Sequence, residues 1–171
     1  FYEMGELGLF ATTLPEVYGG AALNHVCYGL VTREIERVDS GFRSMLSVQS
    51  SLVIYPIFTY GSEDQKQKYL PKLASGEEVW CQLFSEPAGG SDLAALRTRA
   101  EKDGDDWVIN GQKIWTSGAH YSDYGVLVVR TDPTAQKHHG LSYFFIDMKS
   151  PGIEIKPIKQ ISGSSNFNEV Y

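Results

Sequence analysis

The sequence predicts an α+β protein in which an N-terminal α-helical segment is followed by an antiparallel, β-barrel-like domain. The first observation behind this prediction is that residues 1–76 repeat apolar side chains at helical spacing. The second is that residues 77–171 break into short β-prone runs separated by Gly, Pro and Asp. Because helices and strands are segregated, alternating βαβ units are not expected. We therefore expect a helical domain at 1–76 and a β-domain at 77–171.

Three helices are expected in the first half. Residues 23–38 combine apolar positions at helical spacing with several charged ones. Residues 42–60 contain a single ionic residue, an arginine, which predicts a buried helix that Pro56 kinks or divides. Residues 62–65 read Ser-Glu-Asp-Gln, a capping box that opens a third helix, and Gly76 is its stop signal.

The second half predicts a series of short strands. The clearest signal is a hairpin in which 98–101 meets 107–110 across the turn Asp103-Gly104-Asp105-Asp106. Further strands are expected at 79–85, 112–116, 124–131, 141–148, 153–158 and 166–171. Neither a Gly-x-Gly-x-x-Gly nor a Walker motif is present, so a nucleotide would have to be held in another way.

Composition excludes several classes of function. A net charge of -6 argues against nucleic-acid and anionic-membrane partners. No apolar run is long enough for a membrane span, and the two cysteines favour a reducing compartment over a disulfide framework. No His, Cys and acidic residues stand at metal-ligand spacing, so no metal site is expected. Both ends interrupt structured stretches, which suggests a fragment of a longer polypeptide, or else a trimmed chain.

Two segments of the second half carry candidate binding residues. In Ser85–Asp92, adjacent glycines allow close approach of a ligand to the backbone, Ser91 can donate to a phosphate, and Asp92 can cap a short helix. The alternative is a plain connector between a strand and a helix. In Gly111–Gly118, Trp115 can stack on a flat ring while neighbouring hydroxyls bond its polar edge. The alternative here is a core tryptophan.

Together the two segments resemble the acyl-CoA dehydrogenase family. The matching patterns are Ser85-Glu86-Pro87-x-x-Gly90-Ser91-Asp92 and Asn110-Gly111-x-Lys113-x-Trp115-x-Ser117. Further matches run along the chain, at 14–20, 60–76, 145–158 and 167–170. The resemblance implies an FAD cofactor, with cofactor contacts from Gln82, Leu83, Phe84, Ser85, Gly90, Ser91, Trp115, Thr116 and Ser117. The family usually has Asn where this chain has Gly118.

The stretch 39–57 resembles glutaryl-CoA dehydrogenases in particular. The resemblance implies that Arg43 and Ser47 bind the distal carboxylate of the substrate, and that Ser91 contacts its thioester end. A guanidinium suits a carboxylate through paired N–H bonds. The alternative is a structural ion pair of Arg43 with Asp39 or Glu36, since an unpaired buried charge is costly.

The resemblance further implies α,β-dehydrogenation of an acyl-CoA thioester in fatty acid or amino acid catabolism. Electrons would pass to an electron-transferring flavoprotein, and the full-length enzyme would be a homo-oligomer, a tetramer, in a bacterial cytoplasm or the mitochondrial matrix. The family's catalytic base is a Glu of a C-terminal helical domain that this sequence lacks, so no catalytic residue is assigned and the chain alone is expected to be inactive. An oxidase or flavin monooxygenase on the same scaffold, and a non-catalytic binding protein, remain alternatives.

Overall fold

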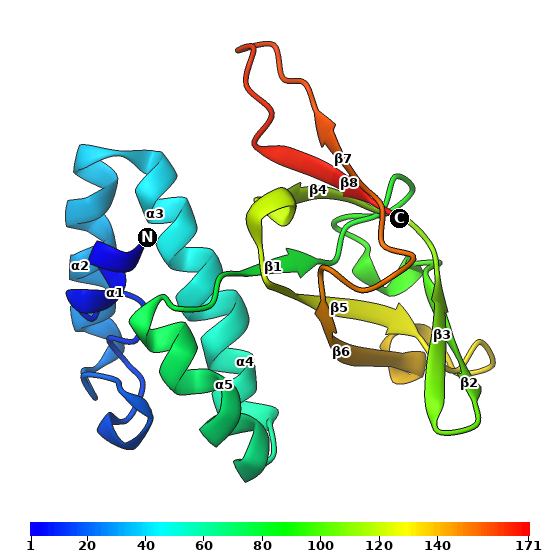
Figure 1. Cartoon of the computed structure of the whole chain (residues 1–171), viewed down its shortest axis with the longest axis horizontal. Coiled ribbons are helices and arrows are strands. Elements are labelled where there is room, and N and C mark those ends of the chain that lie inside the picture. Colours follow the sequence, from blue (N-terminus) through cyan, green and yellow to red (C-terminus); the bar gives the residue numbers. More distant parts are fainter. The chain divides into compact units, whose positions relative to one another are not determined.

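The computed structural model describes all 171 residues, which divide into two compact units, Phe1–Trp80 and Cys81–Tyr171. The first unit is built of helices and the second of strands (Figure 1). The predicted α+β class is confirmed. None of the helices combines the length and the apolar character that crossing a bilayer requires.

The helical unit holds five α-helices, one 3-10 turn and one π-helical segment. They are α1 (Tyr2–Glu6), η1 (Glu16–Tyr18), α2 (His25–Val38), α3 (Ser40–Ser47), η2 (Val48–Ile54), α4 (Tyr55–Tyr60) and α5 (Glu63–Ser75). From α3 to α4 the chain stays helical without a break, as expected for residues 42–60. The irregularity there is the π-helical segment, which ends two residues before Pro56. Pro56 is tolerated because it stands in the first turn of α4.

Local signals fix the ends of α5. The Ser62 hydroxyl accepts the N–H of Gln65 at 3.2 Å, and the Gln65 side chain accepts the N–H of Ser62 at 2.9 Å. This is the predicted capping box. At the other end Gly76 adopts φ 73°, a left-handed conformation that glycine reaches without strain, as its role as stop signal requires. Both predictions are confirmed.

The core of the helical unit buries one part of the long helix and leaves another part exposed. Leu46, Val53 and Ile57 are buried, together with Leu70 and Leu73 of α5. Phe42 and Tyr55 are about half exposed, at 51% and 48%, so the prediction of a buried helix holds only in part. A neutral helix is buried only where neighbours cover it, and α2 and α5 leave these two side chains partly uncovered.

A buried amide ties the long helix to the end of α5. Gln49 is 1% exposed. Its Nε2 donates to the carbonyl oxygens of Leu73 at 3.1 Å and Glu78 at 2.8 Å, and its Oε1 accepts the N–H of Trp80 at 3.3 Å. Both the nitrogen and the oxygen of this amide are therefore hydrogen-bonded inside the helical unit.

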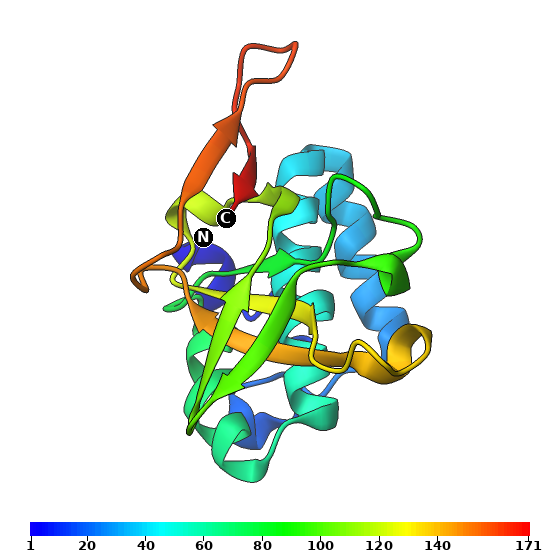
Figure 2. The same ribbon diagram turned by 90° about the vertical axis from the view of Figure 1, so that its right-hand side faces the viewer.

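The β unit contains two sheets. Its strands are β1 (Trp80–Leu83), β2 (Arg99–Asp103), β3 (Asp106–Asn110), β4 (Lys113–Ser117), β5 (Tyr124–Arg130), β6 (Leu141–Asp147), β7 (Ile155–Ile158) and β8 (Phe167–Val170). One sheet has the order β1-β5-β2-β3, with β6 also paired to β5, and the other has the order β4-β8-β7. The sheets do not close into a barrel. The connection between β7 and β8 projects away from the rest of the unit (Figure 2).

Four strand pairings are antiparallel, namely β2 with β3, β5 with β6, β4 with β8 and β7 with β8. The predicted hairpin of β2 and β3 is confirmed, with Asp103 opposite Asp106 and Gly104 at φ 62° in the turn. β2 and β5 pair in parallel, in register at Arg99 and Arg130. The five-stranded sheet is therefore mixed, and not purely antiparallel as predicted.

Both sheets contribute to one apolar core. Cys81 and Leu83 of β1, Leu127 and Val129 of β5, and Val170 of β8 are buried in it. Burial in this apolar core raises the pKa of Cys81 to about 12, so its thiol stays protonated at neutral pH. Cys81 is therefore a residue of the apolar core.

Candidate functional site

Two segments singled out in the sequence lie side by side at the end of β1. The N–H of Ile114 in β4 donates to the carbonyl oxygen of Ser85 at 2.9 Å. One residue earlier in each segment, the Lys113 ammonium donates to the carbonyl oxygen of Phe84 at 3.0 Å. The sheet thus brings the glycine-rich segment and the tryptophan segment together, although almost thirty residues separate them.

The glycine-rich segment forms a tight turn with an open outer side. The backbones of Glu86 and Gly89 bond each other in both directions, at 2.8 and 3.0 Å. Gly90 and Ser91 are exposed beyond this turn. A side chain at Gly89 would lie 3.2 Å from the carbonyl oxygen of Asp92, so glycine keeps the turn this tight. The exposed backbone and the Ser91 hydroxyl are what a phosphate group requires.

Asp92 does not have the predicted capping role. The helix that follows is η3 (Leu93–Ala95), a single 3-10 turn, and no side-chain hydrogen bond of Asp92 caps it. The N–H of Ala95 bonds the carbonyl oxygen of Asp92 instead. A three-residue turn satisfies its N–H groups through the backbone, so the aspartate side chain is left exposed at the segment's edge.

β4 contains a bulge that turns Trp115 outward. Its pairing with β8 shifts register between Lys113 and Thr116, and Trp115 adopts φ 60°. A left-handed conformation costs a bulky residue about 1–3 kcal/mol and is found most often at functional sites. Trp115 is 58% exposed, so it is not a core tryptophan. Its ring edge rests on Phe167, with ring centroids 6.2 Å apart.

The two hydroxyl residues after the tryptophan differ in burial. Ser117 is exposed, as Trp115 is, whereas Thr116 is buried and its Oγ1 has no hydrogen-bond partner. Contact of Thr116 with a bound cofactor would therefore come from its main chain. Its carbonyl oxygen already accepts Nδ2 of Asn168, a fully buried residue, at 2.9 Å. Asn168 also contacts Nδ1 of His120 at 3.2 Å.

The departure from the family pattern at Gly118 has a steric basis. Gly118 has φ 67° and its N–H donates to the carbonyl oxygen of Asn166 at 3.1 Å. A Cβ there would lie 2.5 Å from the ring of Tyr121. Glycine is thus the residue that this turn accepts while Tyr121 occupies its present position.

Sequence reasoning missed a buried ion pair behind these segments. Lys113 Nζ lies 2.8 Å from Glu86 Oε1, and the side chains are 3% and 6% exposed. The Glu86 carboxylate also accepts the N–H groups of Arg97 at 2.6 Å and Thr98 at 2.9 Å. Both residues stand in the matched motifs, which was the available signal, but a motif says nothing about burial.

The electrostatics of the pair follow from this bonding. Burial by itself would raise the pKa of the Glu86 carboxyl, but the Lys113 ammonium and the N–H groups of Arg97 and Thr98 outweigh it and hold that pKa below its usual value. Burial lowers the pKa of Lys113, and Glu86 offsets part of that shift. We conclude that both groups are charged at neutral pH.

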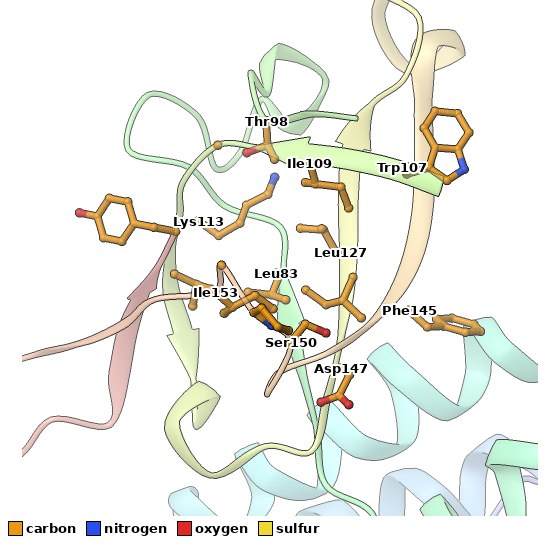
Figure 3. A pocket seen from close by; sticks show the side chains of 16 residues that line it. Leu83, Thr98, Trp107, Ile109, Lys113, Leu127, Phe145, Asp147, Ser150 and Ile153 are labelled. Carbon is orange, nitrogen blue, oxygen red and sulfur yellow. The ribbon is translucent and has the colours of Figure 1, made fainter. Parts of the chain in front are cut away.

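A cavity of about 420 Å³ lies within the β unit, beside this ion pair. Its walls come from both sheets and include Leu83, Trp107, Ile109 and Ile153. Figure 3 shows the Lys113 side chain pointing toward Thr98 at its edge. None of the exposed candidate residues Gly90, Ser91, Trp115 and Ser117 lines it. The cavity is therefore separate from the surface on which the two segments meet.

The helical unit holds the third candidate group. Arg43 Nε lies 2.6 Å from Glu36 Oε2, and Arg43 Nη1 donates to the Ser47 hydroxyl at 3.3 Å. The arginine and glutamate side chains are 38% and 44% exposed. The ion pair of Arg43 with Glu36 is present, and Asp39 instead caps α3 through the N–H groups of Gly41 and Phe42. The guanidinium still reaches the surface next to a serine hydroxyl.

Family comparisons cover almost the whole chain. Residues 1–77 match the family model described as the acyl-CoA dehydrogenase N-terminal domain. Residues 81–170 match the model of the acyl-CoA dehydrogenase middle domain.

Individual relatives agree with the family models. The acyl-CoA dehydrogenase IpdE1 of Mycobacterium tuberculosis is 40% identical over 99% of this chain and 44% of its own length. The human mitochondrial short-chain specific acyl-CoA dehydrogenase is 37% identical over 99% of this chain and 42% of its own. A crystal structure of a glutaryl-CoA dehydrogenase from Mycobacterium smegmatis in complex with FADH2 superposes with a TM-score of 0.88 at 39% identity, over 99% of this chain and 42% of that one. The chain thus spans less than half the length of these proteins.

Proposed function

This chain belongs to the acyl-CoA dehydrogenase family, and we propose that it forms the part of a flavin-dependent enzyme that holds FAD beside an acyl-CoA thioester. The proposed reaction is α,β-dehydrogenation of that thioester. The observation that carries the proposal is the bond between Ile114 and Ser85, which places an exposed tryptophan and an open glycine-rich turn on neighbouring strands. A glutaryl-CoA dehydrogenase in complex with FADH2 shares this fold, which supports the choice of cofactor.

The residues present fit a flavin. Trp115 offers an exposed aromatic face for the isoalloxazine, and Ser117, two residues further on, offers an exposed hydroxyl. Gly90 and Ser91 offer backbone and a hydroxyl for the pyrophosphate. The strand segment Gln82–Ser85 supplies main-chain groups along the ring edge. FAD, when bound, supplies the acceptor for the hydride that leaves the β-carbon of the substrate.

The role of these residues is to bind, orient and shield. Stacking on Trp115 excludes water from one side of the ring, and correct placement of two reactants lowers the entropic barrier to their reaction. The base that removes the α-proton is not assigned to this chain. Glu86 is the carboxylate beside the site, and its ion pair with Lys113 leaves it unsuited to accept a proton. We place the base in the remainder of the full-length enzyme.

The test uses the full-length polypeptide that carries this segment. Anaerobic addition of an acyl-CoA should bleach the flavin absorbance. Trp115→Ala should raise the dissociation constant of FAD about tenfold or more, given about 1–3 kcal/mol for stacking on an aromatic ring. The matched control is Trp107→Ala, since Trp107 is a 40% exposed tryptophan of β3 and lies outside the two segments. Equal effects of both variants, or no flavin in the unaltered protein, would contradict the proposal.

We further propose that the substrate carries a second carboxylate, bound by Arg43 and Ser47. The cluster supports this because Glu36 occupies Arg43 Nε while the guanidinium keeps a further nitrogen, Nη2, outside these contacts. Glu36 can hold the arginine in one orientation, which a bidentate bond to a carboxylate requires. A glutaryl-CoA complex of glutaryl-CoA dehydrogenase superposes at a TM-score of 0.92 and 38% identity, over 99% of this chain and 44% of that one.

Substrate competition tests this assignment. Arg43→Gln in the full-length enzyme should lower kcat/KM for a dicarboxylic acyl-CoA at least tenfold more than for butyryl-CoA, because only the former loses a charge-assisted bond of about 1.5–3 kcal/mol. Arg37→Gln is the control, since Arg37 forms an exposed pair with Glu34 on α2. Equal loss for both substrates would leave Arg43 a structural residue.

Slow reoxidation of the reduced flavin by air would favour an electron-transferring flavoprotein over oxygen as the acceptor.

A further inference from the structure

The ion pair of Glu86 and Lys113 joins three stretches of chain at one point. Through Phe84 it contacts the end of β1, and through Arg97 and Thr98 it contacts the stretch that leads into β2. Lys113 itself is the first residue of β4. The segment 85–98, which contains the exposed glycine-rich turn, is therefore closed into a loop by the Glu86 carboxylate.

Stability alone does not account for this arrangement. Burying two charges costs hydration free energy, and the attraction between the charges seldom offsets that cost in full. An apolar pair at these positions would therefore stabilise the core as much or more. Here every side-chain group of the pair is instead bonded to backbone whose position defines the loop. A buried network of charged hydrogen bonds to backbone groups favours one geometry.

The pair also lies at the foot of the β4 bulge. Along a regular strand, residues two apart face the same side, so Lys113 and Trp115 would point the same way. They do not, since Lys113 is buried and Trp115 is exposed. The bulge, in which Trp115 has a left-handed backbone conformation, allows the two side chains to differ in burial. A strained backbone conformation of this kind persists only where surrounding contacts stabilise it. The ion pair holds the chain two residues before Trp115, and Asn168 holds it one residue after, through Thr116.

We propose that Glu86 and Lys113 are positioning residues for the flavin site: their ion pair sets the glycine-rich turn and the outward-facing Trp115 at the spacing that one bound FAD requires. The inference rests on the proposed function. Neither side chain touches the cofactor. Loss of the pair acts on flavin affinity by releasing both segments at once, while the fold of the β unit is kept by its apolar core.

The experiment measures FAD binding by the full-length apoprotein, through recovery of the flavin absorption bands and quenching of flavin fluorescence. Lys113→Met should raise the dissociation constant of FAD at least tenfold and blur the resolved flavin bands. Val129→Ala is the control, because it shortens a fully buried side chain in the core of the same unit that takes no part in the hydrogen bonds of the pair. It should lower the melting temperature and leave the dissociation constant within twofold of the unaltered protein. A Lys113→Met protein that binds FAD within twofold overturns the inference.

A double-mutant cycle and a milder variant complete the test. Glu86→Gln combined with Lys113→Met should weaken FAD binding no more than the worse single variant does, because both act through one network. Additive losses would show separate roles and overturn the inference. If Lys113→Met fails to fold, Glu86→Asp decides, since it keeps both charges but is one methylene too short to reach all its partners. It should bind FAD at least fivefold more weakly, and binding within twofold overturns the inference. An unaltered protein that binds no FAD overturns the proposed function itself.

Discussion

Replacing Gln49 by leucine tests how the helical unit is held together. The change keeps the volume of the side chain but removes the amide that bonds Leu73, Glu78 and Trp80. At about 1 kcal/mol for each net hydrogen bond, three lost bonds amount to about 3 kcal/mol. Two effects change this loss in the free energy of unfolding. The carbonyl oxygen of Leu73 keeps the N–H of Gly76 as a partner, at 3.3 Å, which makes the loss smaller. A buried group left without a partner costs up to about 3 kcal/mol by itself, which makes the loss larger.

Urea unfolding of the full-length protein, followed by far-UV circular dichroism, measures this effect. Gln49→Leu should lower the free energy of unfolding of the helical unit by about 2–4 kcal/mol. Gln67→Leu is the matched control, since the Gln67 amide makes one exposed bond to Glu63 at 2.8 Å and should cost under about 0.5 kcal/mol. A Gln49→Leu loss below about 1 kcal/mol would refute the reasoning, because the buried amide would then be replaceable by apolar packing alone.

Three further predictions concern stability. Because the folded pKa of Glu86 lies below its ordinary value of 4.5, the free energy of unfolding should fall as pH drops below that value, and Glu86→Gln should flatten part of this slope in acid titrations followed by circular dichroism. A Cβ at Gly20 would lie 1.9 Å from the carbonyl oxygen of Leu14, so Gly20→Ala should cost about 1–3 kcal/mol in urea unfolding, whereas Gly29→Ala in α2 meets open space and should gain about 0.5–1 kcal/mol. Since the buried Thr12 hydroxyl has no partner, Thr12→Val should leave the melting temperature unchanged or raise it, and a clear drop would reveal an unrecognised hydrogen bond.

Short-range signals predicted many of the individual elements, although they missed α1 and the π-helical segment η2. The capping box at Ser62 and the Asp-Gly turn before β3 act over a few residues, and both occur as predicted. Burial was predicted less well because it depends on neighbours that the sequence does not name. The long helix is neutral on all sides, yet Phe42 and Tyr55 are about half exposed, and α2 has no buried residue despite its apolar periodicity.

In the candidate site, too, the local features could be predicted and the contacts between them could not. Its two segments could be recognised from residue types and spacing, but their contact required the sheet that pairs Ser85 with Ile114. The prediction that Arg43 binds a carboxylate also depended on context. In the structure Glu36, seven residues earlier on α2, forms an ion pair with Arg43 and can hold the guanidinium in one orientation.

β4 shows that a linear pattern does not tell which residues of a strand are buried. Alternation along residues 113–117 would place Lys113, Trp115 and Ser117 on one face. A lysine on the same face as an exposed tryptophan would be expected to lie in solvent, as most lysines do. A bulge lies between Lys113 and Thr116, and no glycine marks its position, since the left-handed residue is Trp115 itself. Glu86, distant in sequence, provides the buried lysine with a partner. The interior charge and the exposed ring are therefore consequences of one backbone feature, and neither can be derived from the strand without the other.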